Sequence, residues 1–190
     1  VSYSTVKKSG ADIDVFTIDT GRLFLEVLET AELSQRRYRT PIRFVGPDAF
    51  EVEELVAEDG VYGFRQSIEN RMMCCEIRKI RPLNGALRGA HAWITGLRRD
   101  QSEARMAVPL ARWDNDRELI KVNPIADWSD DRLDRYIDTN DIPINSLHAL
   151  GFVSVGCAPC TRAIELGEEP RAGRWWWEGE ESKECGLHTL

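Results

Sequence analysis

Two pairs of cysteines that lie far apart in the sequence are the strongest constraint on how this chain folds. Cys74 and Cys75 are adjacent, and Cys157 and Cys160 form a C-x2-C loop within residues 156–162. Local pairs of thiols are typical of metal ligation in a reducing compartment. The chain has five cysteines, an odd number, so they cannot all form disulfides within it. A fold that uses both pairs at one metal centre must bring the two segments together.

The adjacent cysteines favour a cluster over a single ion. Side chains at Cys74 and Cys75 point in different directions from a helix, so they fit two irons of a cubic cluster better than one small tetrahedral ion. Four thiolates are the usual ligands of a [4Fe–4S] cluster, whereas zinc bound by four cysteines usually takes two C-x2-C-type pairs. From spacing alone, a zinc site and buried cysteines without a metal stay open as alternatives.

The fifth cysteine, Cys185, has basic neighbours in Lys183 and His188. Positive charge lowers a thiol pKa from about 8.5 and increases the thiolate fraction. We therefore predict that Cys185 is a nucleophile, with a tail cysteine of no chemical role as the alternative. A polar stretch at 165–173 and three tryptophans at 175–177 precede it, which predicts a hinged, mobile lid that carries the thiol into a site.

Composition narrows the class of protein. A length of 190 residues favours a single domain with an ordinary core. The net charge of -7 argues against nonspecific nucleic-acid binding, which needs clustered Lys and Arg. The printed sequence has no apolar run near the roughly 20 residues that span a bilayer and no secretion-signal pattern. We expect a cytoplasmic protein without nucleic-acid or membrane partners.

Strand and helix patterns alternate along the chain. Strands are expected over residues 1–5, 12–19, 41–45 and 89–95, a hairpin over 108–113 and 118–122, and helices over 23–38, 50–59, 71–80 and 129–140, with loops at 60–70 and 97–105. This order predicts an α/β fold with a mostly parallel central sheet flanked by helices. Only residues 6–11 separate the first two strands, fewer than a parallel crossover needs. Those strands either form a hairpin or lack an intervening helical segment in the printed sequence, and we favour the second.

Basic residues accompany the cysteine motifs and the strand ends. Taken singly, each is more simply a solvated surface charge. As a set they predict an anion pocket, because arginine binds phosphate or sulfate with two parallel hydrogen bonds and open sheets bind ligands beyond the carboxyl ends of strands. The set is Arg78, Lys79, Arg98, Arg99, Arg105, Arg162, Arg171 and Arg174.

Five motifs together resemble a known family. They are residues 74–83 (CCEIRKIRPL), 95–102 (TGLRRDQS), 156–162 (GCAPCTR), 173–177 (GRWWW) and 184–188 (ECGLH). The combination resembles the assimilatory adenylyl-sulfate (APS) reductases, the iron–sulfur subtype of the phosphoadenylyl-sulfate (PAPS) reductase family. The resemblance implies an adenine-nucleotide alpha hydrolase-like fold. Residues 1–163 would form the nucleotide-binding domain with the iron–sulfur site, and 164–190 a flexible linker and catalytic tail of the same domain.

The resemblance also implies the chemistry. It predicts thioredoxin-dependent reduction of APS to sulfite and AMP through an S-sulfocysteine on Cys185, with a [4Fe–4S] cluster on Cys74, Cys75, Cys157 and Cys160. The residues predicted to bind substrate are Ser4, Thr20, Gly21, Lys79, Gly96, Arg105, Arg171, Arg174 and His188. The family has a serine-bearing phosphate loop after its first strand, and residues 2–4 are similar to its start. The loop and helix that follow it in the family have no counterpart between Thr5 and Val6.

Several alternatives remain open at this point. Cluster-bearing members of the family prefer APS, so APS is the expected substrate and PAPS a possible second substrate. Reduction of PAPS as the main activity is the alternative. A PP-loop ATP pyrophosphatase-type thiolation enzyme and a non-enzymatic Fe–S or zinc redox sensor are the other two. Thioredoxin or a similar dithiol protein is the expected partner, and a homo-oligomer is left open.

Overall fold

The structure, a computed structural model, describes residues 1–179 and 186–187. Its α-helices are α1 (Ser2–Lys8), α2 (Leu25–Tyr38), α3 (Ala49–Asp59), α4 (Ile68–Cys75), α5 (Arg81–Ala86) and α6 (Asp130–Asn140). Its strands are β1 (Phe16–Ile18), β2 (Arg43–Val45), β3 (Ala92–Ile94), β4 (Ala111–Asp114) and β5 (Leu119–Val122). A π-helix, Glu76–Ile80, joins α4 to α5.

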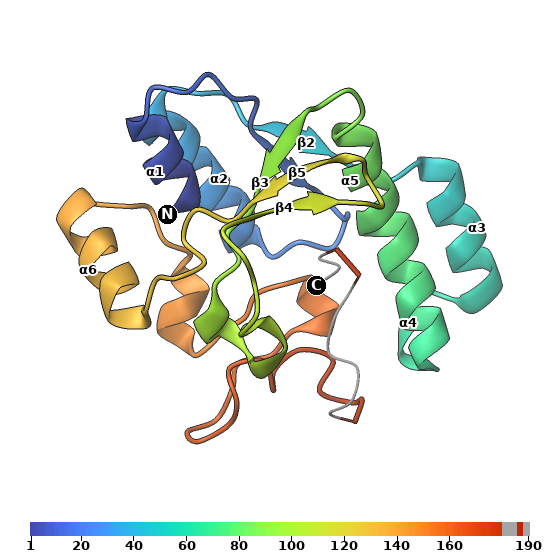
Figure 1. Cartoon of the computed structure of the whole chain (residues 1–190). Coiled ribbons are helices and arrows are strands. Elements are labelled where there is room, and N and C mark those ends of the chain that lie inside the picture. The colour runs from blue at the N-terminus through green and yellow to red at the C-terminus, as the bar shows by residue number, and fades with distance from the viewer. Residues whose placement is uncertain (180–185, 188–190) are drawn as a thin grey trace.

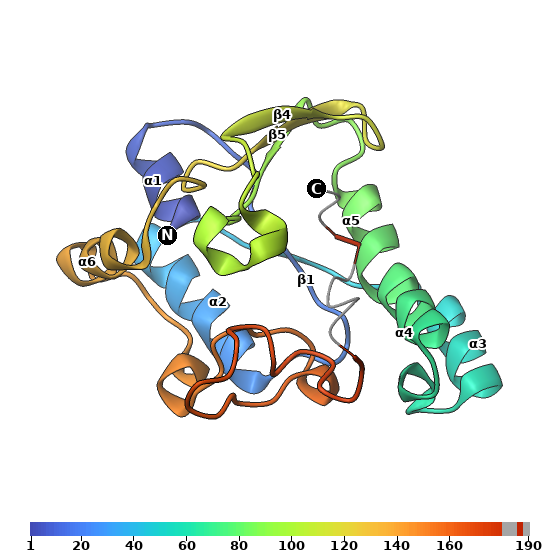
Figure 2. The same cartoon turned by 60° about the horizontal axis from the view of Figure 1, so that its bottom comes forward.

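The strands form two groups with helices on both sides. Strand β1 pairs in parallel with β2, while β5 pairs in parallel with β3 and antiparallel with β4. Helices α3, α4 and α5 lie to one side of the strands and α1, α2 and α6 to the other (Figures 1 and 2). The predicted α/β class with a mostly parallel sheet is confirmed, as is the hairpin, in which Trp113 lies opposite Ile120.

A groove of about 680 Å³ separates the two groups of strands. Residues of β1 and β3 line it, together with Leu83 within α5 and Leu87 directly after α5. These two leucines pack with Trp93 and Leu119 in one of the buried apolar clusters. The groove therefore has an apolar floor that continues into the core.

Short polar side chains begin three of the helices. The Asp48 carboxylate accepts hydrogen bonds from the backbone N–H groups of Phe50 and Glu51 at the start of α3. Ser129 accepts from the N–H of Arg132 at the start of α6, and Ser67 accepts from the N–H of Asn70 at the start of α4. Such caps satisfy N–H groups that have no partner inside the helix. They explain why these helices begin where they do.

The first segment differs from the prediction. Residues 1–5 are not a strand, because Ser2–Lys8 forms α1, and residues 2–4 are therefore not the start of a strand-to-helix loop. Ser4 is buried, and its hydroxyl lies 3.2 Å from the Tyr136 hydroxyl of α6. Residues 2–8 are thus helical where they pack against α6. Residues 6–11 therefore do not join two strands, and neither a hairpin nor a parallel crossover exists there.

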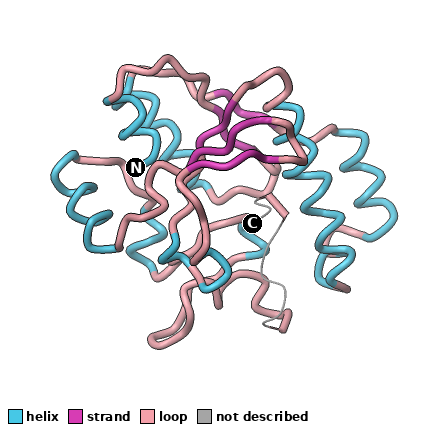
Figure 3. Tube along the Cα trace, in the orientation of Figure 1, coloured by secondary structure: helices cyan, strands magenta, loops and turns pink. Residues whose placement is uncertain are grey.

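Two predicted loops contain helical turns. Residues 60–70 include the 3-10 turn Gly63–Arg65 and the start of α4, and residues 97–105 include the turns Arg99–Gln101 and Glu103–Arg105. Beyond α6 the described residues form the 3-10 turns Ser146–Leu150 and Ala158–Cys160 and one isolated β-bridge, and Figure 3 shows this part mainly as loop. In the described ranges, no helix combines the length and the apolar character needed to cross a membrane.

Candidate active site

All four cysteines of the two pairs line one small cavity. Cys74 and Cys75 are at the end of α4, and Cys157 and Cys160 belong to the loop that forms the turn Ala158–Cys160. Among the described residues, none of the four forms a disulfide. Three of them pack in a buried cluster with Phe64 and Trp175. The fold therefore brings together the two segments that the sequence suggested would meet.

The π-helix places two basic residues next to the cysteines. Arg78 and Lys79 follow Cys75 within Glu76–Ile80, and both are buried and line the cysteine cavity. Such wide turns occur frequently at functional sites. The Arg78 guanidinium donates from Nη1 to the carbonyl of Thr20 at 2.8 Å. This bond ties the loop after β1 to the cysteine-bearing helix.

The loop after β1 contacts the C-x2-C loop directly. The Thr20 hydroxyl lies 3.3 Å from Cys157 Sγ and also accepts a hydrogen bond from the N–H of Arg22. The N–H of Ala158 donates to the carbonyl of Arg22 at 2.8 Å. Gly21 has a φ of +69°, and an added Cβ would lie 3.3 Å from Arg78 Nη1, so this position requires glycine for two reasons.

Burial and nearby charges act in opposite directions on the thiols. Burial raises the pKa of Cys74, and the positive charges of Arg22 and Arg78 partly oppose it. Burial, followed by the charge of Cys157, raises the pKa of Cys160 to about 12. A bound metal reverses this balance, because it stabilises the thiolate form of its ligands.

The surroundings of the cysteines suit a polynuclear anionic group. Within the described ranges, no three cysteine, histidine or carboxylate side chains are spaced to bind a single metal ion. The indole N–H of Trp175, which is 0% exposed and packs against these cysteines, has no hydrogen-bond partner in the part of the chain that the structure describes. Basic side chains complete the lining of the cavity, namely Arg22, Arg71, Arg78 and Lys79.

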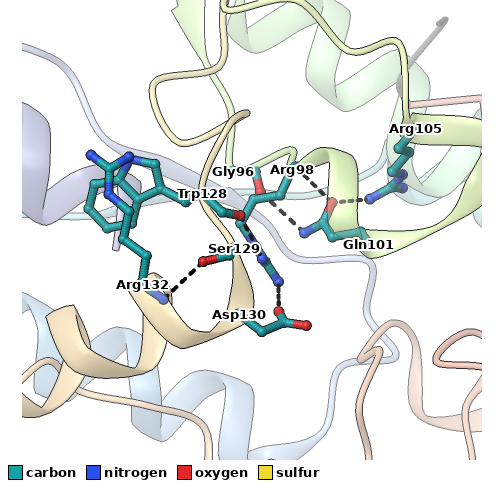
Figure 4. A network of polar contacts seen from close by, with 8 residues as sticks. All are labelled: Gly96, Arg98, Gln101, Arg105, Trp128, Ser129, Asp130 and Arg132. Atoms are coloured by element: carbon teal, nitrogen blue, oxygen red, sulfur yellow. Dashed lines mark hydrogen bonds and ion pairs between the residues drawn. The ribbon is translucent and has the colours of Figure 1, made fainter.

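A larger cavity of about 860 Å³ brings together three of the predicted substrate residues, Gly96, Arg105 and Arg171. Figure 4 shows how Gln101 joins two of them. Its amide nitrogen donates to the carbonyl of Gly96 at 3.3 Å, and its amide oxygen accepts from Arg105 Nη1 at 2.6 Å. Arg98 also lines this cavity, as do the carboxylates of Asp100, Asp130 and Asp134, so the cavity combines a strand end with three guanidinium groups and acidic side chains.

Arg174 is buried beside the C-x2-C loop. Its guanidinium lies 4.5 Å from the centre of the Trp175 ring. A Cβ added to Gly156 would lie only 2.3 Å from Arg174 Nη2, so the absence of a side chain there makes room for the guanidinium. Arg174 also forms a β-bridge with Thr161. It is thus held close to the cysteines in space.

The remaining predicted residues do not all converge. Arg162 pairs with Glu168 through two hydrogen bonds, and Arg99 donates to the carbonyl of Val108. Arg98 donates to the carbonyl of Trp128 and to the Asp130 carboxylate (Figure 4). Arg98 nevertheless lines the larger cavity, whereas Arg99 and Arg162 are not among the described residues that line either cavity, so the prediction of one anion pocket is wrong for Arg99 and Arg162. Ser4 contacts Tyr136, as described above.

The predicted nucleophile lies outside the described residues, as does His188. Gly186 and Leu187, which lie between them in the sequence, are described. Leu187 packs against the apolar cluster of the groove, and a Cβ added to Gly186 would lie 3.0 Å from Ile80 Cδ1. The chain directly after residue 185 thus contacts the end of the π-helix.

Comparison with known proteins identifies the family. Residues 1–163 match the family described as phosphoadenosine phosphosulfate reductase domain. The chain belongs to this family.

Relatives in the family are about half identical to the chain over the aligned residues. Over 178 residues it is 50% identical to a protein of Sinorhizobium fredii strain NGR234 named adenosine 5'-phosphosulfate reductase, covering 94% of the chain and 71% of that protein. An Agrobacterium fabrum protein of the same name is 48% identical over 93% of the chain and 68% of its own length. The crystal structure of phosphoadenylyl-sulfate reductase from Candida auris, a phosphate complex, matches with a TM-score of 0.66 at 25% identity, covering 79% of this chain and 71% of that one. This similarity confirms the fold.

Proposed function

We propose that the chain is an APS reductase, which reduces APS to sulfite and AMP in sulfate assimilation with thioredoxin or a similar dithiol protein as the reductant. The observation that carries this proposal is the convergence of four cysteines on one cavity beside Lys79. Family membership and the names of the relatives support the same activity.

Cys74, Cys75, Cys157 and Cys160 would hold a [4Fe–4S] cluster. Three features support this group: the four thiols that line one cavity, the Trp175 N–H without a partner among the described residues, and the four basic side chains around the thiols. An N–H donor and positive charge both stabilise anionic sulfur. When bound, such a cluster supplies a fixed negative charge near Lys79 and ties α4 to the C-x2-C loop.

The basic residues would bind the phosphosulfate end of the substrate. In our proposal Gly96, Arg105 and Arg171 contribute from the larger cavity and Arg174 from beside the cysteines, while Lys79 supplies positive charge. Thr20 and Gly21 would line the nucleotide, and His188 would act near the thiol or the sulfate. Buried guanidinium and ammonium groups stabilise charge that develops on the leaving phosphate because water is excluded there.

The reaction balances with a dithiol as the only reductant. The Cys185 thiolate attacks the sulfur of APS, an S–S bond forms, and the bond from that sulfur to the phosphate oxygen breaks so that AMP leaves with the electron pair. A thiolate of the partner then attacks Cys185 Sγ, and sulfite leaves with the electron pair of the S–S bond. The partner's second thiolate breaks the mixed disulfide, so the dithiol becomes a disulfide and Cys185 is regenerated.

The proposal also covers organisation and location. Residues 1–163 would form the nucleotide-binding domain, and 164–190 the linker and catalytic tail. A reducing cytoplasm, in which dithiol proteins stay reduced, is the compartment that this chemistry needs. PAPS is the second substrate to test, because the solved relative is a PAPS reductase.

Intact-protein mass spectrometry after incubation with APS, without a reductant, tests the function. The wild type is expected to gain the mass of one SO3 group and to release sulfite when thioredoxin is added, whereas Cys185→Ser gains nothing. An adduct on the serine variant would show that another residue is the nucleophile. A wild type that reacts with PAPS but not with APS would reassign the substrate, and one that reacts with neither would refute the proposed function.

A further inference from the structure

A buried ion pair connects the cysteine-bearing helix to the C-terminal segment. Arg71 is on α4, one turn before Cys74, and is 1% exposed. Its Nε and Nη2 donate to Glu178 Oε1 at 3.0 Å and Oε2 at 2.9 Å. The side chain of Glu178 is 5% exposed. The pair spans 107 positions of the sequence, and none of the motifs includes Arg71.

Such a pair is better explained by positioning than by stability. Desolvating two charges offsets most of their attraction, so apolar residues of similar size often stabilise a protein as well. The two parallel hydrogen bonds fix the direction of both side chains, which a simple apolar contact does not do. The pair therefore defines where Glu178 lies relative to α4.

The segment fixed by this pair contains Arg174 and Trp175. The Arg71 guanidinium lies 4.6 Å from the centre of the Trp175 ring, and that of Arg174 lies 4.5 Å from it. Trp175 is fully buried and has a φ of +43°, a conformation that bulky residues adopt only when their surroundings impose it. The N–H of Glu178 donates to the carbonyl of Trp175 at 2.9 Å. One stacked unit therefore runs from Arg71 through Trp175 to Arg174.

We propose that Arg71 and Glu178 are positioning residues, which together fix Trp175 and, beside it, the Arg174 guanidinium for binding of the substrate. This inference rests on the proposed function, since it gives Arg174 the role assigned there. It adds a pair of residues that would control the rate of the first chemical step without touching the substrate.

The test is the rate of S-sulfocysteine formation at saturating APS in Glu178→Gln and Arg71→Lys, followed by mass spectrometry. Each variant is expected to form the adduct roughly 10- to 100-fold more slowly, because small misplacements of reacting groups have effects of this size. Iron content and visible absorption of Glu178→Gln should equal those of the wild type, because Glu178 is not among the residues that line the cysteine cavity. Arg71→Lys keeps the positive charge but loses the two parallel hydrogen bonds to Glu178. It therefore tests the inference even if Glu178→Gln does not fold.

Asp114→Asn is the matched control. Asp114 and Arg117 form another buried pair, at 3.1 Å with side chains 1% and 7% exposed, and the Arg117 guanidinium lies over the Trp93 ring. This variant should lose stability but keep the wild-type rate of adduct formation. Wild-type rates in both test variants would overturn the inference, as would an equal loss in Asp114→Asn. A wild type that forms no adduct would instead overturn the proposed function.

Discussion

Gly156→Ala tests whether the space beside the C-x2-C loop is reserved for Arg174. The new Cβ would lie 2.3 Å from Nη2 and 2.5 Å from Cζ of that guanidinium, so the guanidinium must move. Because Arg174 is buried against Trp175, it has little room to move. A charge-assisted hydrogen bond lost from the substrate costs about 1.5–3 kcal/mol. We therefore expect kcat/KM for APS to fall roughly 10- to 100-fold.

A double-mutant cycle with Arg174→Ala separates this mechanism from a general disturbance. In the Arg174→Ala background the alanine at position 156 meets no guanidinium, so its further effect on kcat/KM should be within about twofold. Gly85→Ala is the control, because its added Cβ has nothing within 4 Å and lies in α5, where alanine is favoured. An equally large loss from Gly156→Ala in both backgrounds would refute the reasoning.

Two further predictions concern stability. Burial, and then the charge of Arg112, lowers the pKa of Lys121 from 10.5 to about 8, with Arg117 and Arg105 acting in the same direction and Asp114 against it. Between pH 8 and 10.5 the unfolded state binds more protons than the folded state, so the free energy of unfolding should rise with pH. In the wild type this rise should exceed that of Lys121→Met by up to about 1.4 kcal/mol per pH unit. Identical pH profiles of the two proteins in urea denaturation would contradict this prediction. Thr20→Val removes the hydroxyl that contacts Cys157 Sγ and the Arg22 N–H, and anaerobic denaturation should show a loss of about 1 kcal/mol. An unchanged unfolding free energy would show that this hydroxyl does not stabilise the cysteine loop.

Local signals predicted the elements whose ends carry a recognisable residue. Asp48 and Ser129 are strong N-cap residues, and the helices that follow them begin where expected. The turn at 114–116 likewise predicted the β4–β5 hairpin. These features depend on a few neighbouring residues, which a single sequence contains.

Features that depend on tertiary contacts were missed. A five-residue segment with β-branched residues gives no clear period, so the sequence predicts a strand over residues 1–5, whereas the structure has α1 there, packed against Tyr136. The π-helix Glu76–Ile80 has no sequence signature, yet it places Lys79 at the cysteines. Likewise, nothing near Arg71 in the sequence indicates a partner at Glu178.

The candidate site shows the same division. The four cysteines were found from their spacing, and they do share a cavity. The basic residues were found as a set, but their neighbours decide their roles: Glu168 pairs with Arg162, whereas Gly156 and Trp175 enclose Arg174. The sequence shows which residues carry positive charge, but only the packed structure shows which of them already pair with a carboxylate.

Metal and sulfide analysis of anaerobically purified protein tests the central claim most directly. If Cys74, Cys75, Cys157 and Cys160 bind one [4Fe–4S] cluster, the wild type should be brown and contain about four iron atoms and four acid-labile sulfides per chain. Cys75→Ser should lose the colour together with the ability to form the APS adduct. A colourless wild type that contains one zinc ion per chain, or a colourless Cys75→Ser protein that still reacts with APS, would contradict the account.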